Sequence, residues 1–239
     1  MARELWDEMK ASLPPYPAGV AAVPEPIERT AFFPGGLGLW VEGHSLEFEF
    51  PVGQCMVVGQ DFNTVETYNR AREAKSEVNS SRRWQVLRHL LTTFDIPLES
   101  CFYTNAYTGL RATGPETGRF PGAHDARFVE RCPNFFARQL AVAQPNLILM
   151  LGMGPLRALG SRLFGIEVPR TISACENIHA PLNFGYRNVA VVVLTHPSFY
   201  HANVVRRRYA GLAGAEAERA MVWDAKRAVA SGMLLQRLR

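Results

Sequence analysis

Four stretches of the chain are rich in apolar residues and lead into glycine, proline or polar residues. Apolar runs of this length, without strict polar alternation, are typical of strands that are covered on both faces of a parallel sheet. The most apolar run starts at Val189 and leads into the sequence LTHPS. The predicted strands are CMVVG (55–59), CFYTNAY (101–107), LILMLG (147–152) and VAVVVLTHPS (189–198).

Apolar residues recur every three or four positions in the segments between these runs, which predicts amphipathic helices. Asn79-Ser80 caps the first predicted helix and Pro97 stops it, while Asp125 caps the second and Pro145 ends it. The apolar faces of these two helices are Trp84, Leu87, Leu90, Leu91 and Phe94, and Phe128, Cys132, Phe135, Phe136 and Leu140. Two further helices are predicted over 153–163 and about 215–235.

The alternation of strands and helices predicts an α/β fold. We expect a single-domain, three-layer α/β/α sandwich over residues 1–239, with a mostly parallel, four-stranded central sheet. Residues 1–45 are rich in proline and glycine and predict an irregular arm that opens with one short helix, whereas 46–239 form the core. The loop from 108 to about 124 is long for a compact domain, and long loops are often functional.

Composition places the chain among ordinary globular proteins, with 239 residues, 47% hydrophobic and 20% charged. The apolar runs are too short to cross a bilayer, and the N-terminus MARELWDEMK lacks the apolar core of a signal peptide. We therefore expect no membrane association and a cytoplasmic protein, nucleoid-associated if bacterial. The four cysteines form no CxxC pair, so we expect reduced, mostly buried thiols.

Arginine dominates the basic residues, since only three of the 26 Lys and Arg residues are lysines. Arginine binds phosphate well in a bidentate manner, although GC-rich coding also favours it. The consecutive Arg206, Arg207 and Arg208 predict a phosphate-binding surface, with a solvated helix start as the alternative. We expect the loop residues Lys75, Arg111 and Arg119 to be solvated, with contact to DNA as the alternative.

Polar residues directly follow the predicted strands. Because ligands bind beyond the carboxyl ends of parallel strands, Asp61, Asn105 and His196 are expected to share one crevice. The carboxylate can orient water, the amide can pair with the edge of a base, and the imidazole can donate to an oxygen that gains charge. The chain has no GxSxG, Walker or GxGxxG motif, so acyl, phosphoryl and hydride transfer lack their usual residues.

Three segments, GQDFN, YTNAY and LTHPS, resemble in order the signature segments of the uracil-DNA glycosylase superfamily. The stretch RCPNFFARQLAVAQPNLILMLG also resembles the segment around that superfamily's third strand, and the likeness covers roughly residues 52–205. The resemblance implies a uracil-DNA glycosylase-like fold. It also implies hydrolysis of the N-glycosidic bond of uracil, or a related deaminated or modified base, flipped out of DNA to leave an abasic site.

The resemblance also implies a role for each matching residue. Asp61 corresponds to the carboxylate that activates water, and His196 to the histidine that supports the departing base. Pro197 and Ser198 match a rigid loop that pinches the DNA backbone, and Tyr200 matches the wedge that replaces the extruded base. The implied base-binding residues are Gln60, Phe62, Asn63, Tyr68 and Asn105, and the expected DNA-binding residues are Ser198, Tyr200, Arg206 and Arg207.

The sequence departs from the superfamily after Asp61, where Phe62-Asn63-Thr64 replaces Pro-Tyr-His. That tyrosine excludes the 5-methyl group of thymine, so Asn63 puts discrimination against 5-substituted bases in question. Phe62 and Tyr68 are both candidates for the ring that stacks on the base.

We predict no iron–sulfur cluster, metal or other cofactor, because only Cys132 matches one of the four cysteines that hold the cluster in one branch of the superfamily. A monomer acting on DNA is the leading interpretation. One alternative is a catalytically inactive DNA- or base-binding module on the same fold. Another is an enzyme that hydrolyses nucleosides or other small N-glycosides.

Overall fold

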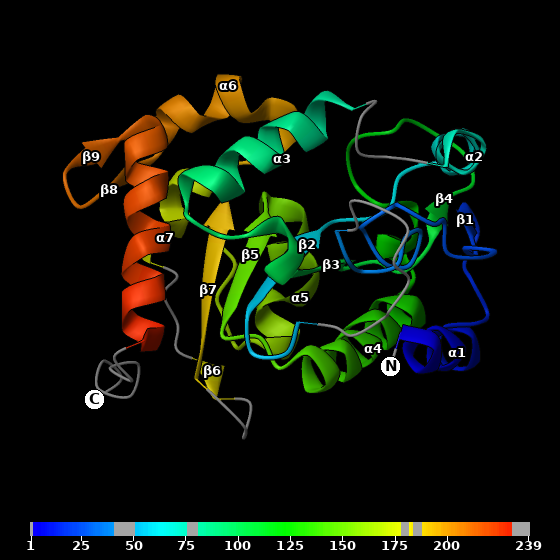
Figure 1. Cartoon of the computed structure of the whole chain (residues 1–239). Helices are drawn as coiled ribbons and strands as arrows, with labels where there is room; N and C mark the ends of the chain where they lie inside the picture. The colour runs from blue at the N-terminus through cyan, green and yellow to red at the C-terminus, as the bar shows by residue number, and fades with distance from the viewer. Residues whose placement is uncertain (1, 41–50, 76–80, 178–181, 184–187, 231–239) are drawn as a thin grey trace.

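The computed structural model describes residues 2–40, 51–75, 81–177, 182–183 and 188–230 (Figure 1). None of the helices within these ranges combines the length and the apolar character that crossing a bilayer requires.

The central sheet has the strand order β3-β2-β5-β7-β6. Its first four strands are parallel, as predicted: β3 (Cys101–Asn105), β2 (Cys55–Gly59), β5 (Leu147–Leu151) and β7 (Asn188–Leu194). The short strand β6 (Leu182–Asn183), which the sequence analysis did not predict, pairs antiparallel with β7 at the edge.

Side chains of the sheet alternate between two separate hydrophobic cores. In β2, Met56 and Val58 belong to one core, and Cys55 and Val57 belong to the other. A strand that is buried on both faces produces this alternation, because successive side chains point to opposite sides. The expected three-layer α/β/α arrangement is therefore present.

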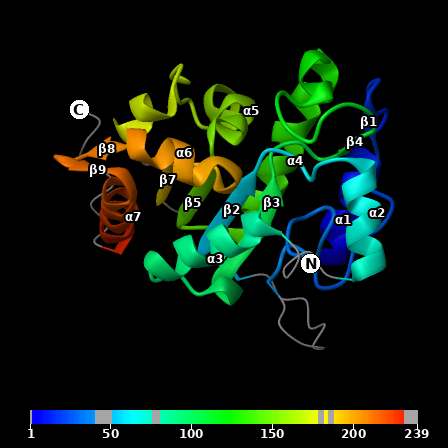
Figure 2. The same cartoon turned by 90° about the horizontal axis from the view of Figure 1, so that it is seen from above.

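Helices cover both faces of the sheet (Figures 1 and 2). On one side lie α1 (Ala2–Ser12), α4 (Ala126–Ala143) and α5 (Met153–Leu163), whose apolar residues join the first core. On the other side lie α3 (Arg82–Thr93) and α7 (Gly214–Ala230), which join the second core. The smaller elements are α2 (Val65–Ala74), α6 (Tyr200–Asn203), and the antiparallel pairs β1 (Val20–Ala21) with β4 (Leu110–Arg111) and β8 (Arg208–Tyr209) with β9 (Leu212–Ala213).

The helix ends agree with the predicted capping residues wherever those residues belong to the described part of the chain. The Asp125 carboxylate accepts the Phe128 N–H at 2.7 Å and so caps α4, as predicted. Asn79 and Ser80, the predicted cap of α3, lie outside the described residues, and Ser81 occupies the N-cap position. The predicted end of the C-terminal helix also lies outside them, beyond Ala230.

The N-terminal arm is more regular than the sequence suggested. Its helix α1 buries Leu5 and Met9, and residues 31–40 run beside β3. The N–H of Phe33 donates to Tyr103 O at 3.0 Å, and the N–H of Tyr103 donates to Gly38 O at 2.8 Å. These bonds satisfy the outer edge of β3 and bring the arm to the carboxyl end of the sheet.

Candidate functional site

A cleft of about 1190 Å³ lies at the carboxyl ends of the parallel strands. Residues that follow three different strands line it, namely Asp61 after β2, Asn105 at the end of β3 and His196 after β7. The structure therefore brings together the three residues that the strand-end rule selected.

Small residues make room for the polar side chains of the cleft. A Cβ atom at Gly59 would lie 2.4 Å from Asn105 Oδ1, and one at Gly154 would lie 2.2 Å from Gln60 Oε1. At either position a Cβ atom would force the polar side chain to move. Gly59 and Gly154 thus allow Asn105 and Gln60 to lie directly against the backbone.

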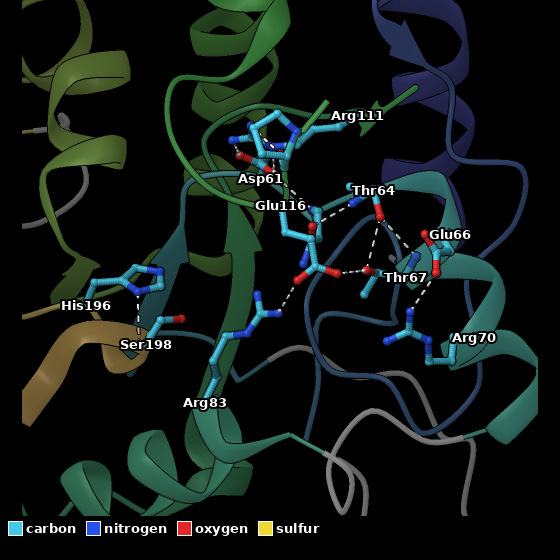
Figure 3. A network of polar contacts seen from close by, with 12 residues as sticks. Asp61, Thr64, Glu66, Thr67, Arg70, Arg83, Arg111, Glu116, His196 and Ser198 are labelled. Atoms are coloured by element: carbon cyan, nitrogen blue, oxygen red, sulfur yellow. Dashed lines mark hydrogen bonds and ion pairs between the residues drawn. The ribbon is translucent and has the colours of Figure 1, made fainter. Parts of the chain in front are cut away.

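The Asp61 carboxylate is buried and accepts four hydrogen bonds, two of them from Arg111, which lies beside it in Figure 3. Oδ1 accepts the backbone N–H of Asn63 at 2.9 Å and Nε of Arg111 at 3.1 Å. Oδ2 accepts Nη2 of Arg111 at 2.8 Å and Nε2 of Gln60 at 2.9 Å. The prediction that Arg111 is solvated is wrong, since its side chain is 2% exposed and pairs with a carboxylate that is 6% exposed.

His196 is held as a neutral hydrogen-bond donor. Its Nδ1 accepts the backbone N–H of Ser198 at 3.1 Å, so the neutral ring carries its proton on Nε2 (Figure 3). The pKa of His196 is lowered to about 4, mainly by burial and in part by the Arg83 cation, while the Asp61 carboxylate acts in the opposite direction. The imidazole is therefore uncharged at neutral pH and can donate to an anion without losing its proton.

Asn105 presents a fixed amide to the cleft. Its Nδ2 donates to Phe33 O at 3.1 Å, which sets the orientation of the side chain. Among the described residues, Oδ1 accepts no hydrogen bond, and Nδ2 has a second N–H, so one acceptor and one donor are left for a ligand.

Phe32 is an aromatic residue of the cleft that the sequence analysis missed. A Cβ at Gly59 would lie 3.4 Å from its ring atom Cε1, so the ring lies beside Gly59 and the Asn105 amide. Trp84 and Tyr103 support the ring with centroid distances of 5.3 and 5.5 Å. The sequence signal is the FFPGG segment of the N-terminal arm.

The predicted base-binding residues after β2 divide into two groups. Gln60, Phe62 and Asn63 line the cleft, although Phe62 and Asn63 are nearly buried. The Asn63 amide oxygen accepts the N–H of Thr64 at 2.8 Å and so stabilises the local turn. Tyr68 does not line the cleft, which corrects that prediction: its ring lies in the core, and its hydroxyl donates to Glu25 O at 2.8 Å.

Phe199 and Tyr200 were both expected as exposed stacking residues, with packing beneath the C-terminal helix as the alternative, and the structure separates the two. Phe199 is 50% exposed and lines the cleft together with Ser198. Tyr200, the predicted wedge, is only partly exposed, packs against the second core and does not line the cleft. Burial raises the pKa of Tyr200 to about 12, with a further contribution from the Glu218 charge. The structure thus favours Phe199 over Tyr200 as the exposed stacking side chain.

One of the two predicted phosphate contacts in the arginine run, that of Arg207, requires correction, and that of Arg206 stays a prediction. Arg206 is exposed but lies outside the cleft. Arg207 is fully buried, donates to Val193 O at 2.6 Å and pairs with Glu218 at 3.5 Å. Arg207 cannot contact a DNA phosphate in this arrangement, because it connects α7 to β7 inside the protein.

Arginines from separate parts of the chain surround the cleft instead. Of the described lining residues, seven are arginines and only two, Asp61 and Glu116, are acidic. Arg83 pairs with Glu116 at 3.4 Å, with both side chains about half exposed, and Arg82 and Arg157 are exposed. The arginines are Arg70, Arg82, Arg83, Arg111, Arg119, Arg157 and Arg162. No spacing in the sequence connects them, so the sequence analysis missed them as a group.

Within the described residues, no three His, Cys, Asp or Glu side chains are grouped so that they could hold a metal ion. The four cysteines are free and buried, and burial raises the pKa of Cys132 to about 12.

No protein-family model matches the chain, and no curated protein matches its sequence. The features that bear on function are therefore the geometry of the cleft and the three short segments that resemble the uracil-DNA glycosylase superfamily.

Proposed function

We propose that the protein is a DNA glycosylase with a uracil-DNA glycosylase-like fold. It hydrolyses the N-glycosidic bond of uracil, or a related deaminated or modified base, that has been flipped out of DNA. The observation that carries the proposal is the meeting of Asp61, Asn105 and a neutral His196 in one arginine-lined cleft. The order of the GQDFN, YTNAY and LTHPS segments, which contain these three residues, also supports it.

In this proposal, the flipped base lies between Phe32 and the Asn105 amide. A pyrimidine edge offers both acceptors and an N–H donor, which complement the free Oδ1 and the second N–H of Asn105. The supported ring of Phe32 provides a stacking surface beside that amide. Selectivity for the base then depends on hydrogen bonding at its edge.

His196 supports the departure of the base. When the bond between the sugar C1′ and the base nitrogen breaks, the electron pair goes to the base, and charge develops on its carbonyl oxygen. The Nε2–H of His196 donates a hydrogen bond to that oxygen, while the ring stays neutral. The departing base anion then takes up a proton from solvent.

Asp61 binds and activates the water that completes the hydrolysis. The water oxygen bonds to C1′ of the positively charged sugar, and its proton passes to the carboxylate and then to solvent. Because Oδ1 and Oδ2 each already accept two donors, the water takes the position of the Gln60 amide on Oδ2. Gln60 is the donor that is displaced most easily, since it is the only neutral side chain among the four.

The surrounding arginines and Phe199 explain how DNA is held. Arg82, Arg83 and Arg157 are exposed at the cleft and provide cations for phosphates of the backbone. Phe199 is exposed beside His196, with ring centroids 6.1 Å apart, and can stack on a base next to the extruded nucleotide.

The proposal is tested with labelled oligonucleotides that carry uracil, thymine opposite guanine, hypoxanthine, xanthine or 5-hydroxymethyluracil. Alkali treatment then cuts the DNA at abasic sites. We expect cutting at one or more of these bases by the wild type and by Arg138→Gln, an exposed arginine of α4 that serves as a control. We expect little cutting by Asp61→Asn or His196→Ala.

A second function, binding of DNA or a flipped base without turnover, is favoured by one observation. All four donors of the Asp61 carboxylate come from the protein, so a water must displace one of them. If no abasic product forms with any base in the panel, while the protein still binds the oligonucleotides in a salt-dependent manner, the binding function replaces the enzymatic one.

A further inference from the structure

Arg111 lies where three segments of the backbone meet. Its strand β4 pairs with β1, where Arg111 lies opposite Val20, and its N–H donates to Asn63 O at 2.8 Å. A parallel bridge also joins Arg111 to Thr64. These contacts fix the Cα of Arg111 beside the segment that follows β2, so its side chain reaches Asp61 from a constrained position.

The Arg111 guanidinium connects Asp61 to a loop. Its Nε and Nη2 form a two-pronged contact with the two oxygens of Asp61, at 3.1 and 2.8 Å. The planar guanidinium matches a carboxylate in this geometry, which the ammonium of a lysine cannot do. The remaining N–H groups donate to four carbonyls of one loop, those of Pro115, Thr117, Gly118 and Arg119, at 2.8 to 3.3 Å.

This loop depends on Arg111 because it has little apolar anchoring of its own. Every residue from Ala112 to Arg119 is exposed, yet residues 116–119 form part of the cleft wall. The other contacts of the loop are polar: Gln60 Nε2 donates to Gly118 O at 2.9 Å, and Glu116 bonds Thr67 and Arg83. Of these groups, only Arg111 is buried and bonds several carbonyls at once.

We propose that Arg111 is a positioning residue for the reaction, an inference that rests on the proposed glycosylase function. It holds the Asp61 carboxylate and the 115–119 wall as one unit, with three of the four donors to Asp61 fixed: its own two N–H groups and the backbone N–H of Asn63. Water then reaches Asp61 at one position, that of the Gln60 amide on Oδ2. The two-pronged contact, and not charge alone, is what the reaction requires.

The test compares Arg111→Lys and Arg111→Gln with the wild type in single-turnover reactions on an oligonucleotide that contains the excised base. We expect the maximal rate to fall about 100-fold in both variants, because misplacement by about 1 Å has an effect of that size. The protein concentration that gives half of the maximal rate should change by less than about threefold, since binding of the DNA before the reaction is preserved. Recovery of the wild-type rate by Arg111→Lys would overturn the inference, because it would show that charge is sufficient.

A second measurement does not require turnover. A glutamate-specific protease under native conditions reports whether the loop opens at Glu116. We expect cleavage there to become about tenfold faster in Arg111→Lys and Arg111→Gln, but not in Arg138→Gln, whose ion pair with Glu8 joins α4 to α1. The same cleavage rate in all four proteins would also overturn the inference.

One further variant and the activity of the wild type separate the possible failures. Arg111→Gln leaves the buried Asp61 without its charge partner, so the double variant Asp61→Asn with Arg111→Gln repeats the protease measurement without an unpaired charge. If the wild type excises no base, the proposed function fails, but the protease measurement still decides whether Arg111 holds the wall. If the wild type is active and the Arg111 variants match it, the positioning role alone fails.

Discussion

The backbone N–H of Ser198 donates to Nδ1 of His196 at 3.1 Å, two residues along the same loop. This bond selects the tautomer with the proton on Nε2, and burial together with the Arg83 cation keeps the ring uncharged. The loop after β7 therefore provides a neutral donor whose orientation is set by its own backbone.

The first prediction concerns pH and stability. Burial and the Arg83 cation lower the pKa of His196 from 6.5 to about 4 in the folded protein. Between these values the unfolded chain binds more protons, so the free energy of unfolding should fall as the pH decreases from about 6.5 to about 4. In His196→Gln, the free energy of unfolding measured with urea should depend less steeply on pH over this range. Equal pH dependence in the two proteins would contradict this assignment.

The second prediction concerns the buried pair of Arg207 and Glu218. Both side chains are 0% exposed, and Glu218 Oε1 also accepts the N–H of Thr195, the residue before His196. Removing one partner leaves a buried charge unpaired, so Arg207→Met should lower the free energy of unfolding by about 3–5 kcal/mol.

The matched control is Arg206→Gln at the exposed neighbouring position, which should change the stability by less than about 0.5 kcal/mol. Urea denaturation measures both variants. Similar small effects at the two positions would show that Arg207 is not buried as described.

The third prediction concerns the arginines at the cleft. If Arg82 and Arg157 each contact a phosphate, Arg82→Gln and Arg157→Gln should each weaken DNA binding and reduce the salt slope of log K by about one. Fluorescence anisotropy of a labelled oligonucleotide in a salt series provides the measurement. Arg206→Gln should leave the slope unchanged. A smaller slope in Arg206→Gln, with no change in Arg82→Gln or Arg157→Gln, would indicate that the arginine run contacts DNA instead.

The fourth prediction concerns Phe199. Because its side chain is 50% exposed, Phe199→Ala should leave the melting temperature nearly unchanged. Loss of base stacking should weaken binding to single-stranded DNA by about 1–3 kcal/mol. Tyr200→Ala, which removes a partly buried ring from the second core, should instead lower the stability. A binding defect in Tyr200→Ala without a stability defect would restore the wedge role predicted for Tyr200.

The parallel sheet and its polar edge were predictable because they depend on local patterns. Buried parallel strands need continuous apolar residues, as in 147–151, and residues after such strands meet at one edge. Asp61, Asn105 and His196 could be selected in this way without knowledge of any contact. The cap at Asp125 is equally local, because donor and acceptor are three residues apart.

The missed residues act through contacts that are distant in sequence. Arg111 lies 50 residues from Asp61, on a two-residue strand without an apolar pattern, so the sequence alone does not indicate that it is buried. Phe32 reaches the cleft only because the arm pairs with β3. Arg207 was misassigned because a run of three arginines does not show which side chain points inward, and its partner Glu218 comes from α7.

The most direct test of the central claim is to measure free base released from a uracil-containing oligonucleotide by mass spectrometry, in single-turnover reactions with excess protein. We predict that the wild type releases uracil, or another base of the panel, and leaves one abasic site for each base released. His196→Ala should be slower by about 100- to 1000-fold, the usual effect of removing one donor to a developing anion. Release of no base by the wild type, or equal release by wild type and His196→Ala, would contradict the account.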